Sequence, residues 1–145
     1  MVFETFVPFN TPSSKNSKNA TSKGVFHSAT VRKYLQKLGI QHYSPSKKTV
    51  KEYKTRFNIF RPCFQGFEKP TGLIYVGFHF VRDSKRKFDY INAMQVLFDL
   101  MTAHDFIEDD NCDYVVPFIF KKGDEHYTVD KANAGCYIKI TDEPI

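Results

Sequence analysis

The chain has 145 residues, which is long enough to bury one core and too short for a second independent domain. The three cysteines have no paired C-x-x-C spacing, so the sequence indicates neither a disulfide framework nor a thiolate zinc site. The start has no signal-peptide pattern, and no apolar run approaches the roughly 20 residues that span a bilayer, so we expect a cytoplasmic protein with no membrane partner.

The two signs of charge are segregated along the chain, and the net charge of +5 hides this. Up to Phe88 there are 17 Lys and Arg residues against 4 Asp and Glu, whereas from Asp89 onward there are 4 against 12. Basic residues gathered in this way attract nucleic-acid phosphates and gain affinity by releasing counterions. The alternative is a solvated basic face with no partner. The sequence thus predicts a polyanion-binding first part and an acidic site in the second.

The chain begins with an apolar segment, residues 2–9, that is expected to form a strand. Residues 11–24 are rich in Ser, Asn and Lys and have no periodicity, which predicts an exposed loop. The lysines of this loop are free to reach a ligand: Lys15, Lys18 and Lys23.

Two helices are expected in the rest of the basic half. After a short strand at 25–27, Ser28 is suited to cap a helix that ends at Gly39 and carries basic residues on its wet side, Arg32 and Lys33. Segment 46–59 repeats the helical spacing less clearly, and either helix is placed to lie on DNA. Aromatic residues set among these basic ones are candidates to face a base or a sugar: Tyr43, Tyr53 and Phe64.

The second half alternates strands with one long helix. Residues 72–82 are rich in β-branched and aromatic side chains, which indicates a buried strand in which His79 is a satisfied core residue. A basic turn with Lys85, Arg86 and Lys87 follows, then a helix from about Asp89 to His104, strands at 114–121 and 136–140, and a loop at 122–134. The predicted fold class is α/β (α+β): one domain over 1–145, with a small mixed β-sheet and two to three helices.

The helix at 89–104 is apolar except for one narrow stripe. At 100° per residue its polar side chains fall in one arc: Asn92, Gln95, Asp99 and Thr102, with Asp89 on the rim. Burying Asp99 without a partner would be costly, so something must satisfy the stripe. A cation shared with Asp109 and Asp110 is the obvious candidate, because magnesium takes oxygen ligands from one or two carboxylates, waters and substrate phosphates.

Each acidic residue also has a purely structural interpretation. Asp89 is well placed as a helix N-cap, where a carboxylate accepts backbone N–H bonds and contributes about 1 kcal/mol. Asp99 is open to pairing with a basic side chain. The run Glu108, Asp109 and Asp110 is typical of a solvated turn.

Taken jointly, these residues form the pattern D-x-x-N-x(6)-D-x(9)-D-D within FDYINAMQVLFDLMTAHDFIEDDNCDYV, residues 88–115. This pattern resembles the signature of the RusA-like family of Holliday-junction resolvases, in which a helix begins with D-x-D-N, continues through a Lys and a further Asp, and a hydrophobic turn ends in D-D. The opening FVPFNTPSSKNSK resembles the family's Pro- and Lys/Arg-rich loop, and GLIYVGFHFV resembles the strand before its acidic helix.

The resemblance implies a homodimeric endonuclease, dependent on Mg²⁺ with Mn²⁺ as the alternative, that resolves four-way DNA junctions by paired nicks. It also implies a bacterial or phage genome as the source. Carried over by position, Asp89 and Asp110 would be metal ligands with Asp109 beside them, and Asn92 and Asp99 would support the site. The grip on phosphates would come from Lys15, Lys18, Lys23, Arg32, Lys33, Lys85, Arg86 and Lys87.

Two positions depart from the family's pattern. Ile91 stands where the family has its second helix carboxylate, and Gln95 stands where it has its catalytic Lys. Either the site is rebuilt locally, with Glu108 or Asp109 as a substitute, or cleavage has been lost and binding of DNA junctions retained. A third hypothesis, a protein-interaction module whose acidic half recruits a basic partner, leaves the basic half without a role.

Overall fold

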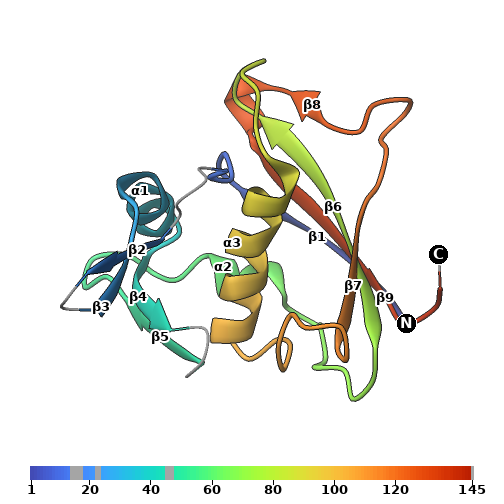
Figure 1. Cartoon of the computed structure of the whole chain (residues 1–145), viewed down its shortest axis with the longest axis horizontal. Helices are drawn as coiled ribbons and strands as arrows, with labels where there is room; N and C mark the ends of the chain where they lie inside the picture. The colour runs from blue at the N-terminus through green and yellow to red at the C-terminus, as the bar shows by residue number, and fades with distance from the viewer. Residues whose placement is uncertain (14–17, 22–23, 45–47, 145) are drawn as a thin grey trace.

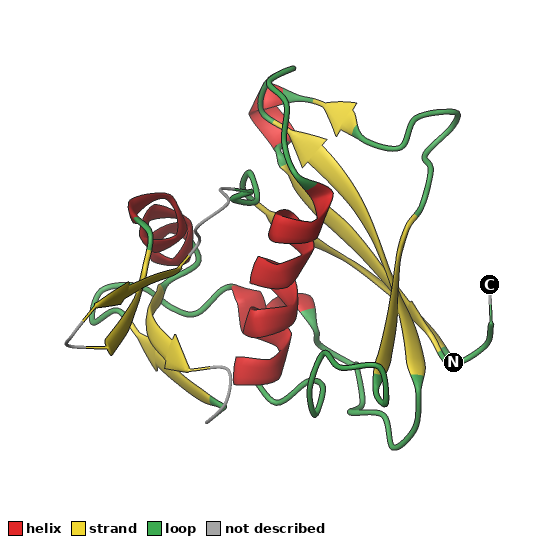
Figure 2. Ribbon diagram, viewed as in Figure 1, coloured by secondary structure: helices red, strands yellow, loops and turns green. Residues whose placement is uncertain are grey.

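The computed structural model describes residues 1–13, 18–21, 24–44 and 48–144. This part of the chain forms a five-stranded mixed sheet, two two-stranded sheets and a few helices (Figures 1 and 2), so the predicted α+β class is confirmed. The elements in chain order are β1 (Val2–Pro8), β2 (Lys18–Thr21), β3 (Gly24–His27), α1 (Ala29–Lys37), β4 (Ile40–Ser44), β5 (Thr49–Glu52), α2 (Phe60–Cys63), β6 (Ile74–Arg82), α3 (Tyr90–Ala103), β7 (Val115–Ile119), β8 (Thr128–Val129), the 3-10 helix η2 (Lys131–Asn133) and β9 (Gly135–Thr141).

The main sheet has the strand order β1-β9-β6-β7, with β8 beside the end of β6. Strand β9 runs antiparallel to both of its neighbours, and β7 and β8 run parallel to β6. In the central strand β6 every residue except Tyr75 is buried. A strand that is buried on both sides has a nearly continuous run of apolar residues. The apolar run at 72–82 therefore predicted this buried strand correctly.

Helix α3 packs on one face of the main sheet, and the two small sheets and helix α1 lie on the same side (Figure 1). Aromatic contacts join the helix to the sheet: the ring of Phe98 in α3 stands edge-on to Phe78 of β6, with centroids 5.1 Å apart. Each large apolar side chain buried here contributes about 1.5–3 kcal/mol. No helix in the described ranges is long and apolar enough to cross a membrane.

Two expectations for the basic half are wrong. The predicted exposed loop at 11–24 contains β2, which pairs with β3, and its first residue Thr11 is fully buried. The predicted helix at 46–59 is absent from the described residues 48–59, which contain the short strand β5 (Thr49–Glu52), paired with β4 in the register Tyr43↔Val50. Cross-strand pairing favours β-branched residues such as Thr49 and Val50, and this outweighs a weakly helical spacing.

Candidate functional site

Asp89 is the N-cap of α3. Its Oδ1 accepts hydrogen bonds from the backbone N–H groups of Ile91, at 2.8 Å, and Asn92, at 3.2 Å. The carboxylate thereby satisfies two N–H groups that the first helical turn leaves unpaired, and it lies at the positive end of the helix dipole. The N-cap interpretation of Asp89 is confirmed.

The side-chain amide of Gln95 joins two carboxylates. Its Nε2 donates to Oδ1 of Asp99 at 2.7 Å, one turn along α3, and to Oδ2 of Asp110 at 2.9 Å in the turn after the helix. Both N–H bonds of one amide are used in this way. Asp99 is only 8% exposed, so the predicted polar stripe is real, and Gln95 is one of the groups that satisfies it.

Asp109 holds the acidic turn in shape. Its Oδ1 accepts from the backbone N–H of Asp110 at 2.8 Å, and its Oδ2 accepts from Nδ2 of Asn111 at 3.0 Å. Side chains that bond the backbone of the next residues are typical of turns. Asp109 therefore stabilises the turn that brings Asp110 to Gln95, and both of its oxygens are engaged in doing so.

Glu108 belongs to a separate cluster of four charges. Nζ of Lys69 lies 2.6 Å from Asp105 and 2.7 Å from Glu108, and Nζ of Lys48 lies 3.1 Å and 2.9 Å from the same two carboxylates. Hydrogen bonds from Lys69 and then Lys48 lower the pKa of both acids. This ion-pair cluster was not predicted, because the two lysines lie far from the acids in the sequence. It makes Glu108 a partner of lysines and not a substitute metal ligand.

These contacts test the predicted metal site. Among the described residues, no group of three or more His, Cys, Asp and Glu side chains is placed to hold a metal ion, so Asp89, Asp109 and Asp110 do not converge as predicted. Asp89 precedes Gln95 by six residues, about 9 Å along a helix. Two carboxylates, those of Asp99 and Asp110, do approach a common atom. That atom is Nε2 of Gln95, which donates a hydrogen bond to each of them. As it stands, this donor set does not fit a magnesium ion.

The beginning of the N-terminal loop is fixed against the acidic helix. Nδ2 of Asn92, on α3, donates to the carbonyl of Ser13 at 3.3 Å. The guanidinium of Arg82, at the end of β6, donates to the carbonyl of Thr11 at 2.6 Å and is buried, and burial lowers its pKa. Asn92 therefore holds the beginning of this loop against α3, and the supporting role that the resemblance implies for it stays a prediction.

The predicted basic residues fall into two described groups. Lys85, Arg86 and Lys87 are exposed in the loop between β6 and α3, directly before the Asp89 cap. A second pair, Arg32 and Lys33, is exposed on α1. Lys15 and Lys23 lie outside the described residues, and of Lys18 only the backbone in β2 is described.

His79 is a satisfied core residue, as predicted. It is fully buried in β6, with Nδ1 3.0 Å from the carbonyl oxygen of Phe120 and Nε2 3.1 Å from Oγ1 of Thr128. A carbonyl only accepts, so Nδ1 carries the proton and Nε2 accepts from the threonine hydroxyl. Both ring nitrogens serve the packing of the sheet.

The aromatic residues expected to face DNA are mostly in the core. Tyr43 and Phe64 are 3% and 2% exposed, and Tyr53 is half-buried. Two other tyrosines, Tyr90 and Tyr127, line a pocket next to Asp89. The position of Tyr90 could have been predicted from the sequence, because it directly follows the capping residue Asp89. Nothing in the sequence indicated that Tyr127 lies beside it.

No protein-family model matches the sequence, and a search of curated proteins gives no match. The geometry of the acidic helix and the sequence pattern over residues 88–115 therefore carry the function proposed below.

Proposed function

We propose that the chain binds branched DNA, such as four-way junctions, through a RusA-like acidic helix and basic surface that have lost cleavage. The observation that carries the proposal is the Gln95 amide between Asp99 and Asp110. Hydrogen bonds to charged groups contribute about 1.5–3 kcal/mol. The amide thus holds the two carboxylates together without a cation, at the position where the resemblance places a lysine.

The exposed basic residues supply the affinity for DNA in this proposal. Lys85, Arg86 and Lys87 lie next to the start of α3, and Arg32 and Lys33 add a second group on α1. Contacts of lysine and arginine with phosphates release counterions, so binding weakens steeply as salt is raised. The resemblance to RusA-like resolvases adds the cytoplasm of a bacterial cell as the compartment, with a bacterial or phage gene as the source.

Metal-dependent nicking is the second candidate function, and the approach of Asp99 and Asp110 to one atom favours it. Magnesium is usually held by one or two carboxylates together with waters and substrate phosphates. For these two acids to serve, Gln95 would have to leave its place between them or turn its amide oxygen toward them.

A nicking assay separates the two candidates. A labelled four-way junction is incubated with the protein in Mg²⁺ or Mn²⁺, with linear duplex as the control, while junction binding is measured at several salt concentrations. We expect salt-sensitive binding that prefers the junction and no paired nicks. Paired nicks that Asp110→Asn abolishes would instead establish a resolvase.

A reactivated variant tests the resemblance itself. Ile91 is 75% exposed and Gln95 is also exposed. The double substitution Ile91→Asp with Gln95→Lys therefore changes only exposed side chains. If the acidic helix is a degraded RusA-like site, the double variant gains magnesium-dependent nicking that the natural chain lacks. A folded double variant that binds junctions without nicking them would count against this interpretation.

The proposal includes a homodimer, because a two-fold junction is bound most simply by two copies. The face of the main sheet away from α3 carries no helix in the described part (Figure 1), and it presents apolar side chains from four strands: Phe6, Tyr75, Tyr137, Val116 and Phe118. We expect sedimentation to give a dimer that Tyr137→Glu dissociates. Phe57→Glu, at a site 87% exposed, is the matched control.

A further inference from the structure

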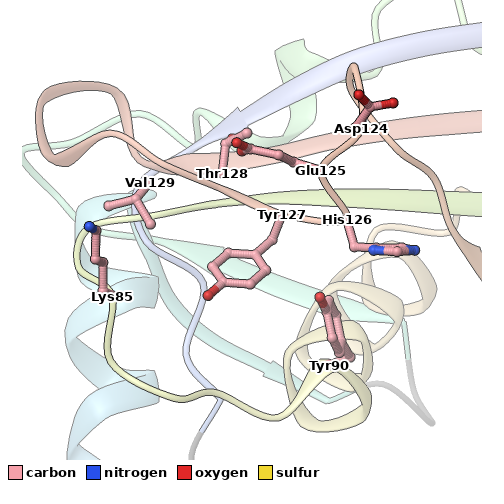
Figure 3. A pocket seen from close by; sticks show the side chains of 8 residues that line it. All are labelled: Lys85, Tyr90, Asp124, Glu125, His126, Tyr127, Thr128 and Val129. Carbon is pink, nitrogen blue, oxygen red and sulfur yellow. The ribbon is translucent and has the colours of Figure 1, made fainter.

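A pocket of about 550 Å³ lies beside the start of α3. Its walls come from the basic loop before the helix, from the first residue of the helix and from the segment leading into β8: Lys85, Tyr90, Asp124, Glu125, Tyr127 and Thr128 are among the lining residues (Figure 3). Pockets of about 300–1,000 Å³ are the size that binds small molecules and single groups of larger ligands. The pocket is therefore large enough for one nucleotide.

Two tyrosines line this pocket, and both of their rings pack against Phe88. The rings of Tyr90 and Tyr127 lie 6.5 Å apart at 73° to each other. Each packs edge-on against Phe88, with centroid distances of 4.8 Å for Tyr90 and 5.1 Å for Tyr127. The guanidinium of Arg82 lies 4.3 Å from the centre of the Phe88 ring. The two aromatic walls are thus supported by a residue that is itself fixed by stacking.

The polar groups of the pocket have opposite charges at its two ends. Lys85 lies at one end, and Asp124 lies at the other, on the turn where Lys122 and Glu125 exchange backbone hydrogen bonds of 3.0 Å and 3.2 Å (Figure 3). A nucleotide is complementary to this arrangement, because its negative phosphate matches Lys85 and the amino group of its neutral base matches a carboxylate. Carboxylates such as those of Asp124 and Glu125 accept hydrogen bonds from the exocyclic amino group of cytosine.

We propose that this pocket binds one unpaired nucleobase of a DNA strand whose backbone is held by the basic loop, and that the base carries an exocyclic amino group. The inference rests on the DNA binding proposed above and goes further by assigning a specific recognition site. A base in a duplex is stacked and paired and enters a pocket only at a cost of a few kcal/mol, whereas a branch point or a bulge supplies an unstacked base. Aromatic side chains bind such bases by stacking. The tyrosines then explain a preference for branched DNA over duplex.

The test compares a labelled duplex with the same duplex carrying a bulge of unpaired cytosines, by fluorescence anisotropy at fixed ionic strength. We expect the natural chain to bind the bulged DNA about tenfold more tightly, which corresponds to about 1.4 kcal/mol. Tyr127→Ala should abolish this preference and leave duplex affinity within about twofold, whereas Tyr127→Phe, which keeps the ring, retains it. Tyr114→Ala is the control, because Tyr114 is 38% exposed and lies outside the pocket.

A second readout locates the base without any substitution. Photocross-linking of the natural chain to DNA with 5-iodocytosine in the bulge should modify Tyr127 or Tyr90. The proposal is overturned if the chain binds duplex and bulged DNA equally, if Tyr127→Ala keeps the preference, or if the cross-link falls outside the pocket. Absence of salt-sensitive binding to any DNA would overturn the proposed function together with the pocket, so the two failures are distinguishable.

Discussion

His104 and Asn58 share a hydrogen bond in the core, with Nε2 of the histidine 2.8 Å from Nδ2 of the asparagine. The asparagine amide donates, so Nε2 accepts, and Nδ1 carries the proton that it donates to the carbonyl oxygen of Leu100 at 2.7 Å. His104 is 5% exposed, and burial lowers its pKa from 6.5 to about 4. Its two bonds suit the neutral ring.

The depressed pKa of His104 makes the fold sensitive to acid. Between pH 6.5 and about 4, the unfolded chain binds a proton that the folded chain does not, so the free energy of unfolding decreases as the pH falls through this window. The full shift corresponds to about 3 kcal/mol. Urea unfolding should show His104→Gln to be less stable than the natural chain near neutral pH, but with a smaller loss toward about pH 5. His126→Gln, at an exposed histidine, should keep the natural pH dependence.

The single substitution Gln95→Glu should create a cation-binding site. Gln95→Glu places a third carboxylate against Asp99 and Asp110, and like charges at this distance destabilise the fold. We expect the melting temperature of this variant to be lowered, and to rise again with Mn²⁺ or Mg²⁺, because a ligand that binds only the folded state stabilises it. Gln36→Glu, on the exposed side of α1, should show neither change. A metal-independent melting temperature for Gln95→Glu would contradict this prediction.

The acidic helix was predictable because the interactions that define it are local. Asp89 caps the helix that it precedes, and Gln95 and Asp99 are four residues apart, so a helical wheel places them together. The contact with Asp110 was not predictable, because it depends on the path of the turn after α3. That turn passes through Asp105 with φ of 62°, a conformation that Asp tolerates better than most residues.

The missed contacts around the acidic helix join distant segments. Lys69 reaches Asp105 across 36 positions, and the pocket brings Tyr127 to Phe88 and Tyr90. No period or motif records such pairs, since they depend on how the loops and α3 are placed in the folded chain. The wrong prediction at 46–59 has a different cause, because β4 and β5 are neighbours in the sequence and their cross-strand pairing outweighed a weakly helical spacing.

The ion-pair cluster at the end of α3 should respond to salt. Lys69→Met removes one of its two lysines, so the pKa values of Asp105 and Glu108 should rise toward their ordinary range, which carboxyl carbon shifts in NMR titrations would report. Carboxylates with depressed pKa values stabilise the fold above their unfolded pKa and lose this effect as the pH falls. The variant should melt earlier at low salt and match the natural chain at about 1 M salt, where exposed charges are screened. Lys121→Met, at another exposed lysine, should melt as the natural chain does.

Two glycines of the main sheet should differ in their tolerance of alanine. A Cβ atom on Gly135 would overlap both the Phe6 ring and the backbone oxygen of Val7, on the adjacent strand β1. A Cβ atom on Gly77 would overlap only the ring of Phe118, which is half-buried on the edge strand β7. A side chain can rotate away, but the spacing of two hydrogen-bonded strands is fixed.

Gly135→Ala should therefore cost more stability than Gly77→Ala, within or above the range of about 1–3 kcal/mol that is typical of overpacking. Urea unfolding of both variants would measure the difference. Combining Gly77→Ala with Phe118→Leu should recover most of the loss, because the smaller side chain leaves room for the new methyl group. Combining Gly135→Ala with Phe6→Leu should recover little, since the carbonyl of Val7 stays in place. Equal rescue of the two variants would show that strand spacing adapts, contrary to this account.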